Sequence, residues 1–265
     1  MPNATAEQAL ITPEALRPWI AGVRSPHLTG PAGQAFVQLP DALPRVVLRV
    51  TADGHRDVLV LGPRVRATYH ESKALVSCVE LRLAPGTARP LLGVPAAELL
   101  GAALPLEVLP GGAARRLAAG LRWLGPEEVV PYLAEALPGL LPASADPSYT
   151  ALLRAGAEAL SVRADRTPAQ VRDVARELAL SERQLRNVFA DGVGVSPKQY
   201  ARINRVRTVL TRGTGTPWAE VAATTGYYDQ SHMTSDFRAV MGVPPRSFFS
   251  GRLPLPTPCR ATRRP

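Results

Sequence analysis

Two stretches of the chain carry polar side chains at the spacing of one helix face. The first covers residues 181–187 and the second residues 230–238. In each, apolar residues recur at three-to-four spacing, so the amide, hydroxyl and guanidinium groups fall on the opposite face. Such groups can hydrogen-bond to base edges and bind phosphates. The candidate site residues are Ser181, Arg183, Gln184, Arg186, Asn187, Gln230, Ser231, His232, Thr234, Ser235 and Arg238.

A repeated pattern must position these two polar faces. The run VARELALSERQLRNVFADGVGVSP, residues 174–197, aligns with VAATTGYYDQSHMTSDFRAVMGVPP, residues 221–245, which has one extra residue in its turn. Each copy predicts a short amphipathic helix, a tight turn and a second helix, which together form a helix-turn-helix unit. A second helix held in this way fits the major groove of duplex DNA.

Capping residues predict where the helices begin. Each unit is expected to start at a Thr-Pro pair, with proline at the first helical position, because proline has the backbone angle of a helix and needs no amide partner there. The expected units cover residues 168–190 and 217–241, and a longer helix over residues 197–212 connects them. The predicted caps are Thr167, Ser181, Ser196, Thr216 and Asp229.

The region of residues 149–250 resembles the DNA-binding domain of the AraC/XylS family of bacterial transcription regulators. The resemblance rests on A-x-x-L-x-L-S from Ala175, G-V-S-P from Gly194, G-Y-Y-D-Q-S-H from Gly226 and F-R-x-x-x-G-V-x-P from Phe237. It implies two recognition helices in adjacent major-groove segments of double-stranded promoter DNA. It also implies RNA polymerase as a partner if the protein is an activator.

The resemblance assigns roles by position, and two departures bear on them. The family often has arginine two residues before the conserved phenylalanine of each recognition helix, where this chain has Asn187 and Ser235, so its base readout departs from the commonest one. Asp236 would repel phosphate if it faced DNA. The roles expected are base-edge contacts for Arg183, Asn187, Ser231, His232 and Ser235, and phosphate or mixed contacts for Arg186, Gln230, Thr234 and Arg238.

The charge distribution favours a nucleic-acid partner for the same region. The formal net charge is +9; residues 1–150 carry 13 Lys or Arg and 13 Asp or Glu, whereas residues 151–265 carry 18 and 9. All the net positive charge therefore lies on the half with the repeated units. A non-specific architectural DNA-binding protein would share this charge, and it remains an alternative to a sequence-specific regulator.

The sequence pattern of the amino-terminal half predicts short strands with turns between them. Strands are expected at residues 36–39, 45–50, 57–61, 65–69 and 75–83, with a hairpin at Asp53-Gly54. This pattern predicts a small antiparallel β-barrel or sandwich, followed by helices near residues 114–124 and 127–137. The whole chain is then an α+β protein whose carboxy-terminal domain is all-α.

A second resemblance covers the end of this half. The run P-G-x-x-x-x-L-L-G-V-P, from Pro85 to Pro95, is similar to the end of the cupin-like sensor domain in one subgroup of these regulators. It implies a small-molecule effector, or a homodimer formed through the two helices; the equal alternative is that these helices only cover their own barrel. The expected organisation is a flexible arm at residues 1–15, a sensor or dimerisation domain at 16–141, a linker at 142–148, the DNA-binding domain, and a disordered tail at 251–265.

An enzymatic barrel with an attached DNA-binding module is the other alternative, and the sequence gives it no support. His27, His55 and His70 lack the spacing of metal ligands, and Cys78 and Cys259 are too few for a zinc site. There is no G-x-S-x-G elbow and no phosphate-binding loop. We therefore expect no catalytic residue, no metal and no cofactor. With neither an export segment nor an apolar span, a cytoplasmic protein bound to the bacterial nucleoid is expected.

Two groups in the amino-terminal half admit both a functional and a structural interpretation. Trp19, Phe36, Tyr69 and Trp123 would line an effector pocket or form ordinary core, and core is favoured. Arg45, Arg49, Arg64 and Arg66 would hold an acidic ligand or form a solvated outer face, and the solvated face is favoured.

Overall fold

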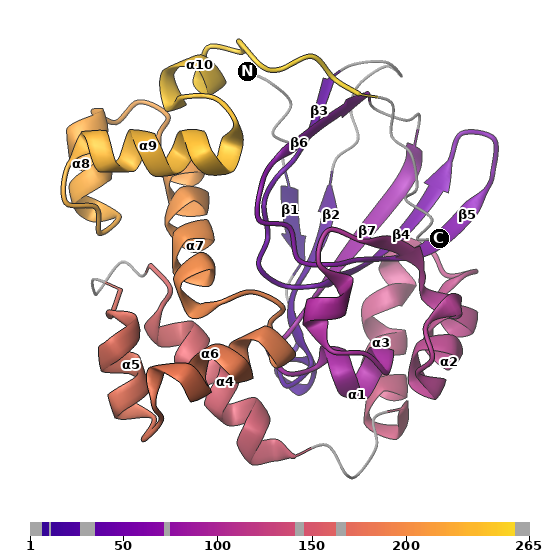
Figure 1. Cartoon of the computed structure of the whole chain (residues 1–265). Helices are drawn as coiled ribbons and strands as arrows, with labels where there is room; N and C mark the ends of the chain where they lie inside the picture. The colour runs from indigo at the N-terminus through magenta and orange to yellow at the C-terminus, as the bar shows by residue number, and fades with distance from the viewer. Residues whose placement is uncertain are drawn as a thin grey trace.

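The computed structural model describes residues 7–10, 12–26, 35–71, 75–140, 146–162 and 168–257. The described part up to residue 140 contains two β-sheets, three α-helices and three short 3-10 helices, and the part from residue 146 is helical (Figure 1). This is the α+β architecture that the sequence predicts. In the described part of the chain, every helix is too short or too polar to cross a bilayer.

A six-stranded antiparallel sheet forms the centre of the amino-terminal unit, residues 7–140. Its strand order is β1-β2-β7-β4-β5-β8, and β3 pairs with β6 in a separate two-stranded sheet. The hairpin expected at Asp53-Gly54 joins β4 to β5, and Gly54 has the positive φ of 83° that such a turn favours. The strands are β1 Glu7–Leu10, β2 Ile20–Pro26, β3 Ala35–Gln38, β4 Arg45–Thr51, β5 Arg56–Leu61, β6 Thr68–Glu71, β7 Leu75–Leu83 and β8 Ala103–Pro105.

Two details of the amino-terminal half, and one of the carboxy-terminal tail, differ from the expectation. The presumed loose arm contains β1, which pairs with β2 in antiparallel register, and the strand expected at residues 65–69 begins only at Thr68. The start of the presumed free tail is ordered as well. Thr257 donates its amide to the carbonyl oxygen of Tyr69 at 2.9 Å, because β6 offers an unpaired edge to the returning chain. Residues 258–265 lie outside the described residues.

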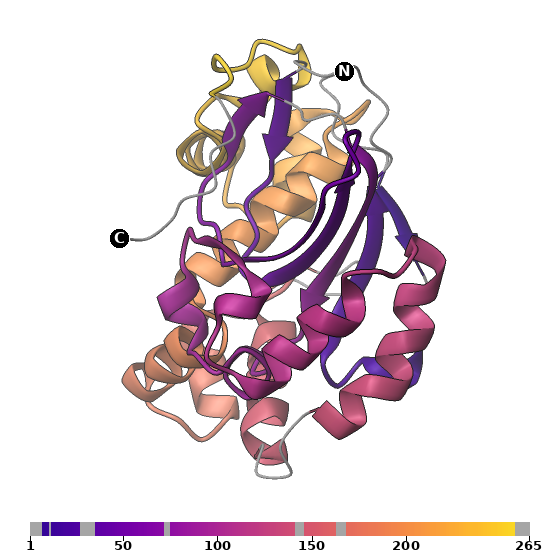
Figure 2. The ribbon, with the colours of Figure 1, turned by 90° about the vertical axis from the view of Figure 1, so that its right-hand side faces the viewer.

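Helices cover one face of the six-stranded sheet (Figure 2). Alternate residues of β4, β5 and β7, such as Val46, Val60 and Leu81, are buried against Leu117 of α2 and Leu133 of α3. The helices expected near residues 114–124 and 127–137 are therefore present, with slightly different limits. The elements between β7 and the second half are α1 Ala88–Leu92, η2 Ala96–Leu99, η3 Leu106–Val108, α2 Gly112–Leu121 and α3 Pro126–Leu140; η1 Glu14–Leu16 precedes β2.

The helical unit, residues 146–250, contains both predicted helix-turn-helix units. In the turn of the first unit the Leu180 amide donates to the carbonyl oxygen of Ala175 at 2.8 Å, and in the second the Tyr227 amide donates to that of Ala222 at 3.1 Å. Equivalent hydrogen bonds therefore stabilise the two turns. Ala179 has a φ of 54° where the second copy has Gly226 at 76°. The helices are α4 Pro147–Ala159, α5 Val171–Glu177, α6 Glu182–Gly192, α7 Pro197–Arg212, α8 Trp218–Thr224, α9 Gln230–Met241 and α10 Pro245–Phe249.

The two Thr-Pro caps are wrong. The first helix starts at Val171 after Gln170, three residues beyond Pro168, and the second starts at Trp218 with Pro217 itself as the cap. A proline needs no amide partner, so Pro217 suits the position just before the first turn as well as the first position within it, whereas Pro168 lies ahead of the cap Gln170. Thr167 lies outside the described residues, as do His27, Cys259 and most of the expected linker.

The cores of the helical unit include buried residues of the amino-terminal unit. Ala42 and Leu43 of the amino-terminal unit are buried with α4, α5 and α6 in one cluster, and Val37 and Tyr69 are buried with α8 and α9 in another. The segment between β3 and β4 and the two-stranded sheet thus complete the cores of the two helix-turn-helix units.

Candidate nucleic-acid interface

The second helix of the first unit, α6, exposes the polar face that the sequence predicts. Ser181 caps it, accepting from the Gln184 amide at 3.2 Å, while the Gln184 side chain accepts from the Ser181 amide at 2.8 Å. These two side chains are thereby used to hold the helix start. Arg183, Arg186 and Asn187 are exposed and stand free of the cap, so they are the groups of α6 that are available for base or phosphate contacts.

The second helix of the second unit, α9, exposes a matching face. Asp229 caps it and accepts from the His232 amide at 2.7 Å, as predicted. Gln230, Ser231 and Ser235 are exposed and Thr234 is half-buried. The His232 ring packs edge-on against Tyr227, with centroids 5.2 Å apart, so its position is fixed although the residue is exposed.

Asp236 does not face outward with its neighbours. Its side chain is only 13% exposed and pairs with Arg202 of α7 at 2.8 Å and with Arg205 at 3.6 Å. Arg205 also lies over the Tyr227 ring, 5.1 Å from its centroid. The carboxylate therefore joins α9 to the connecting helix. Phosphate repulsion was expected only if Asp236 faced DNA, and Asp236 instead faces α7. Sequence reasoning missed this role, although Arg202 and Arg205 share one face of α7 at a spacing of three.

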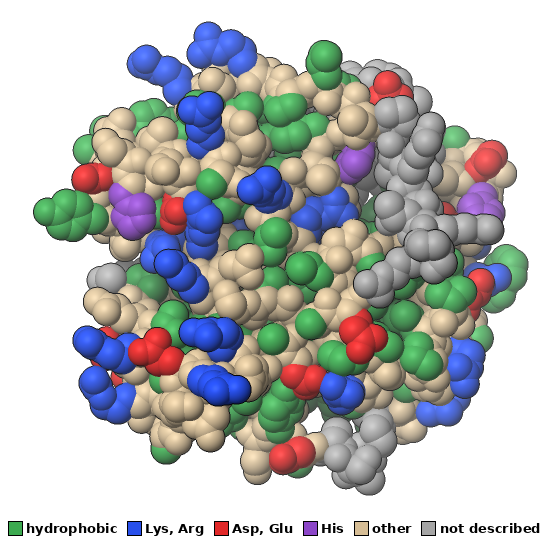
Figure 3. All heavy atoms as spheres, viewed as in Figure 1, with side chains coloured by type: hydrophobic (Ala, Val, Ile, Leu, Met, Phe, Trp, Pro, Cys, Tyr) green, Lys and Arg blue, Asp and Glu red, His purple; other side chains and the backbone are tan. Residues whose placement is uncertain are grey.

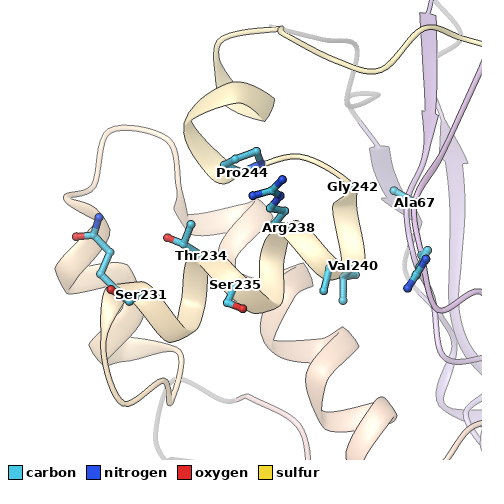
Figure 4. Close-up of a pocket in the computed structure, with 11 residues that line it drawn as sticks. Ala67, Ser231, Thr234, Ser235, Arg238, Val240, Gly242 and Pro244 are labelled. Atoms are coloured by element: carbon cyan, nitrogen blue, oxygen red, sulfur yellow. The ribbon is translucent and has the colours of Figure 1, made fainter.

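The carboxyl end of α9 rests on the amino-terminal unit. Ala67 donates its amide to the carbonyl oxygen of Val240 at 2.8 Å, and the Tyr69 hydroxyl donates to that of Met241 at 2.6 Å. Between α9 and the Arg66-Ala67 segment lies a groove of about 760 Å³, lined on the α9 side mainly by the residues predicted to contact DNA (Figure 4). The exposed polar face of α9 and the Arg66-Ala67 segment of the amino-terminal unit thus line the same groove.

A buried charge cluster joins the same two units. Asp41, 2% exposed, accepts from Arg82 at 2.8 and 3.0 Å and lies 3.6 Å from Arg207 of α7. Arg207 also donates to the carbonyl oxygen of Pro40 at 2.9 Å. Burial alone would raise the pKa of Asp41, but the guanidinium groups of Arg82, Arg207 and Arg45 outweigh it and hold this pKa well below its usual range.

The two recognition helices lie at opposite ends of the connecting helix α7. In Figure 1, α7 stands upright, with α9 at its upper end and α6 at its lower end. Figure 3, from the same side, has most of its Lys and Arg groups over the helical unit. The two recognition helices and the net positive charge of residues 151–265 therefore belong to the same unit.

The histidines and the cysteine considered as metal ligands or nucleophiles do not form a common site within the described residues. His55 pairs with Asp57 at 2.9 Å, and His70 contacts Thr68 at 2.9 Å. Burial raises the pKa of the Cys78 thiol to about 12, which makes it a poor nucleophile. No group of three or more His, Cys, Asp and Glu residues within the described ranges is arranged to hold a metal ion.

The aromatic residues and arginines that the sequence singles out in the amino-terminal half do not form one common site. Trp19 packs on the main core, whereas Trp123 is 73% exposed and fits neither the pocket nor the core interpretation. Arg45 pairs with Glu80 at 3.0 Å and Arg49 with Asp57 at 2.6 Å, so these two arginines are paired within the sheet.

Residues 174–251 match a protein-family model described as a helix-turn-helix domain. Among solved structures, the C-terminal domain of AraT from Geobacillus stearothermophilus is 22% identical, with a TM-score of 0.35, and covers 39% of this chain and 88% of its own. An AraC-type regulator from Chromobacterium violaceum is 23% identical, with a TM-score of 0.33, and covers 40% and 96%. ToxT from Vibrio cholerae is 9% identical, with a TM-score of 0.43, and covers 86% and 96%.

No curated protein matches the chain. The family match contains both recognition helices, the connecting helix and the turn of the second unit, which are the elements whose geometry is described above. Residues 174–251 of the chain therefore form a helix-turn-helix domain.

Proposed function

We propose that the chain is a sequence-specific transcription regulator that inserts α6 and α9 into successive major-groove segments of promoter DNA. The observation that carries this proposal is the pair of exposed polar helix faces at the two ends of α7. With 16 residues, α7 is about 24 Å long, and half a helix diameter on either side adds about 10 Å. The resulting span is of the order of one duplex turn, about 34 Å.

In this proposal the side chains that read bases are Asn187 and Arg183 of α6 and Ser231, His232 and Ser235 of α9. An asparagine amide can form two hydrogen bonds with adenine, so Asn187 is suited to base readout. Arg186, Gln230, Thr234 and Arg238 bind phosphates and orient the helices. Ser181 and Gln184 contribute through the helix start, because their side chains hold each other.

The amino-terminal unit is proposed to control this docking, through a small-molecule effector or through a second copy of the chain. Support comes from the contacts of Ala67 and Tyr69 with the end of α9, through which a change in the sheet would move that recognition helix. A crevice between the sheet and α2–α3 measures only about 10 Å³, so an effector at that place would have to open it. An activator would also contact RNA polymerase from this DNA-bound position. As a regulator without catalytic activity, the protein would work in the cytoplasm on nucleoid DNA.

Selection of duplexes from a random pool by the full chain tests the proposal. A recovered site with two short conserved segments, about one helical turn apart, is expected, with binding that weakens as salt rises. Recovery of unrelated sequences with equal affinity would instead indicate an architectural DNA-binding protein. The full chain is required, since Val37 and Tyr69 complete the core of the second unit.

A further inference from the structure

The groove beside α9 joins the two units and carries unneutralised positive charge. Arg66 of the amino-terminal unit and Arg238 of α9 both line it, together with the side chains of Ser231, Thr234 and Ser235. Both arginines are exposed, and no ion pair to either is formed within the described residues. No Asp or Glu is among the lining residues of the described chain. The groove therefore offers guanidinium and hydroxyl donors without a counter-charge.

The position of Arg66 is held by the backbone rather than left to a mobile loop. Its neighbour Ala67 is hydrogen-bonded to Val240, and Tyr69 further along is hydrogen-bonded to Met241. In Figure 4 the Ala67 segment stands beside the carboxyl end of α9, and Ser231, Thr234, Ser235 and Arg238 follow along that helix. Whatever polyanion contacts this face of α9 therefore lies within reach of Arg66.

We propose that Arg66 binds a backbone phosphate of the DNA segment that α9 enters, so that the amino-terminal unit forms part of the DNA interface. This inference rests on the proposed function. The sugar-phosphate backbone fits the groove because it borders the major groove, carries one negative charge per nucleotide and takes its contacts from arginines and hydroxyls. The contact adds affinity and fixes the register of α9, and it carries no base preference of its own.

Arg45 and Arg49 are not available to bind a phosphate, because each already forms an ion pair. Each is engaged by a carboxylate of the sheet, at 3.0 and 2.6 Å. Among the four arginines that the sequence singles out in this half, Arg66 is the one that lines the groove. The acidic ligand considered for them thus becomes the nucleic acid itself.

The test compares full-length variants on a selected duplex and on a random duplex. Arg66→Ala is expected to weaken binding to both by the same factor, of the order of fivefold, and to lower the salt slope by about 0.9. Arg66→Lys keeps the charge and should restore most of the slope. The matched control is Arg17→Ala, because Arg17 is also an exposed arginine of the amino-terminal unit. Its removal should change neither quantity.

Neutral methylphosphonate groups, placed one at a time along the selected duplex, locate the contact. In the wild-type protein one substitution next to the α9 half-site should weaken binding, and in Arg66→Ala that same substitution should have no further effect. If every methylphosphonate acts equally on both proteins, or if the salt slope is unchanged in Arg66→Ala, the inference is wrong. The proposed function then still stands, provided the wild-type chain prefers its selected duplex; without such a preference both proposals fail.

Discussion

The hydroxyl of Tyr69 donates a hydrogen bond of 2.6 Å to the carbonyl oxygen of Met241, across 172 residues of chain. One residue is in the two-stranded sheet and the other is the last residue of a recognition helix. Both side chains are buried in the same cluster. A recognition helix is thus fastened at its carboxyl end to the unit proposed to control it, and the consequences can be measured.

Replacement of Tyr69 by phenylalanine should lower the free energy of unfolding by about 1 kcal/mol, because a buried carbonyl oxygen loses its donor. Burial raises the pKa of Tyr69 to about 12, above the value near 10 of an unfolded chain. The hydroxyl therefore contributes fully below about pH 10, and its contribution is lost as the pH rises through about 12. Urea unfolding of both proteins at pH 7 and at pH 11 to 12 measures the difference.

The control for this substitution is Tyr228→Phe, since the side chain of Tyr228 is 93% exposed. Removing its hydroxyl should leave the stability within about 0.5 kcal/mol of the wild type. Equal losses in the two variants would show that the Tyr69–Met241 bond contributes nothing to stability.

Asp41→Asn should be the most damaging of these substitutions. It leaves the guanidinium groups of Arg82 and Arg207 buried without their shared carboxylate, at a cost of about 3–5 kcal/mol. Because the folded pKa of Asp41 is lowered, its contribution is fully present above the unfolded value near 3.9, declines below that value, and is lost only as the pH falls through the lower folded pKa. Unfolding in urea should therefore separate variant from wild type most at pH 7, and the difference should narrow steadily as the pH is lowered below about 4.

The matched control is Asp173→Asn. Its carboxylate is 38% exposed and pairs with Arg176 at 3.3 Å on the surface of α5. Loss of such a pair costs less than about 1 kcal/mol. A loss at Asp41 as small as that at Asp173 would mean that the buried cluster is not needed to join the two units.

Local patterns made much of the helical unit predictable. The caps Ser181, Ser196 and Asp229 were correct, since each accepts from an amide three residues ahead and so depends on sequence neighbours alone. The beginnings at Pro168 and Pro217 were wrong: Pro217 is the cap rather than the first helical residue, a position that suits proline equally well, and Pro168 lies ahead of the cap Gln170.

Contacts between distant segments were out of reach of the sequence. The pairing of β1 with β2, the shared cores and the approach of Arg66 to α9 depend on how strands and helices pack, and local pattern does not encode that. The exposed polar faces of α6 and α9 could be predicted because an amphipathic helix separates its two faces. The inward turn of Asp236 could not, because a polar residue on the border of the apolar stripe has no unique direction.

Asp236→Asn tests whether the angle of α9 matters for recognition. The substitution removes the charge that pairs with Arg202 and Arg205, and we expect a loss of about 1–2 kcal/mol in stability. Binding to the selected duplex should weaken more than binding to random duplex, because α9 is then held less firmly in its reading position. Ser235→Ala, next to it but exposed, leaves the ion pairs intact and should not change stability. Equal loss of binding on both duplexes would assign Asp236 a purely structural role.

Asn187 and Arg186 are neighbours on α6, both exposed, and they separate base readout from phosphate binding. Asn187→Ala should reduce the preference for one base pair of the site by about 1–3 kcal/mol and leave the salt slope unchanged. Arg186→Ala should weaken every duplex alike and lower the slope by about 1. Affinities of both variants for a set of single-base-pair changes, each measured at several salt concentrations, distinguish the two effects. If the two variants give the same pattern across that set, the division of roles along α6 is wrong.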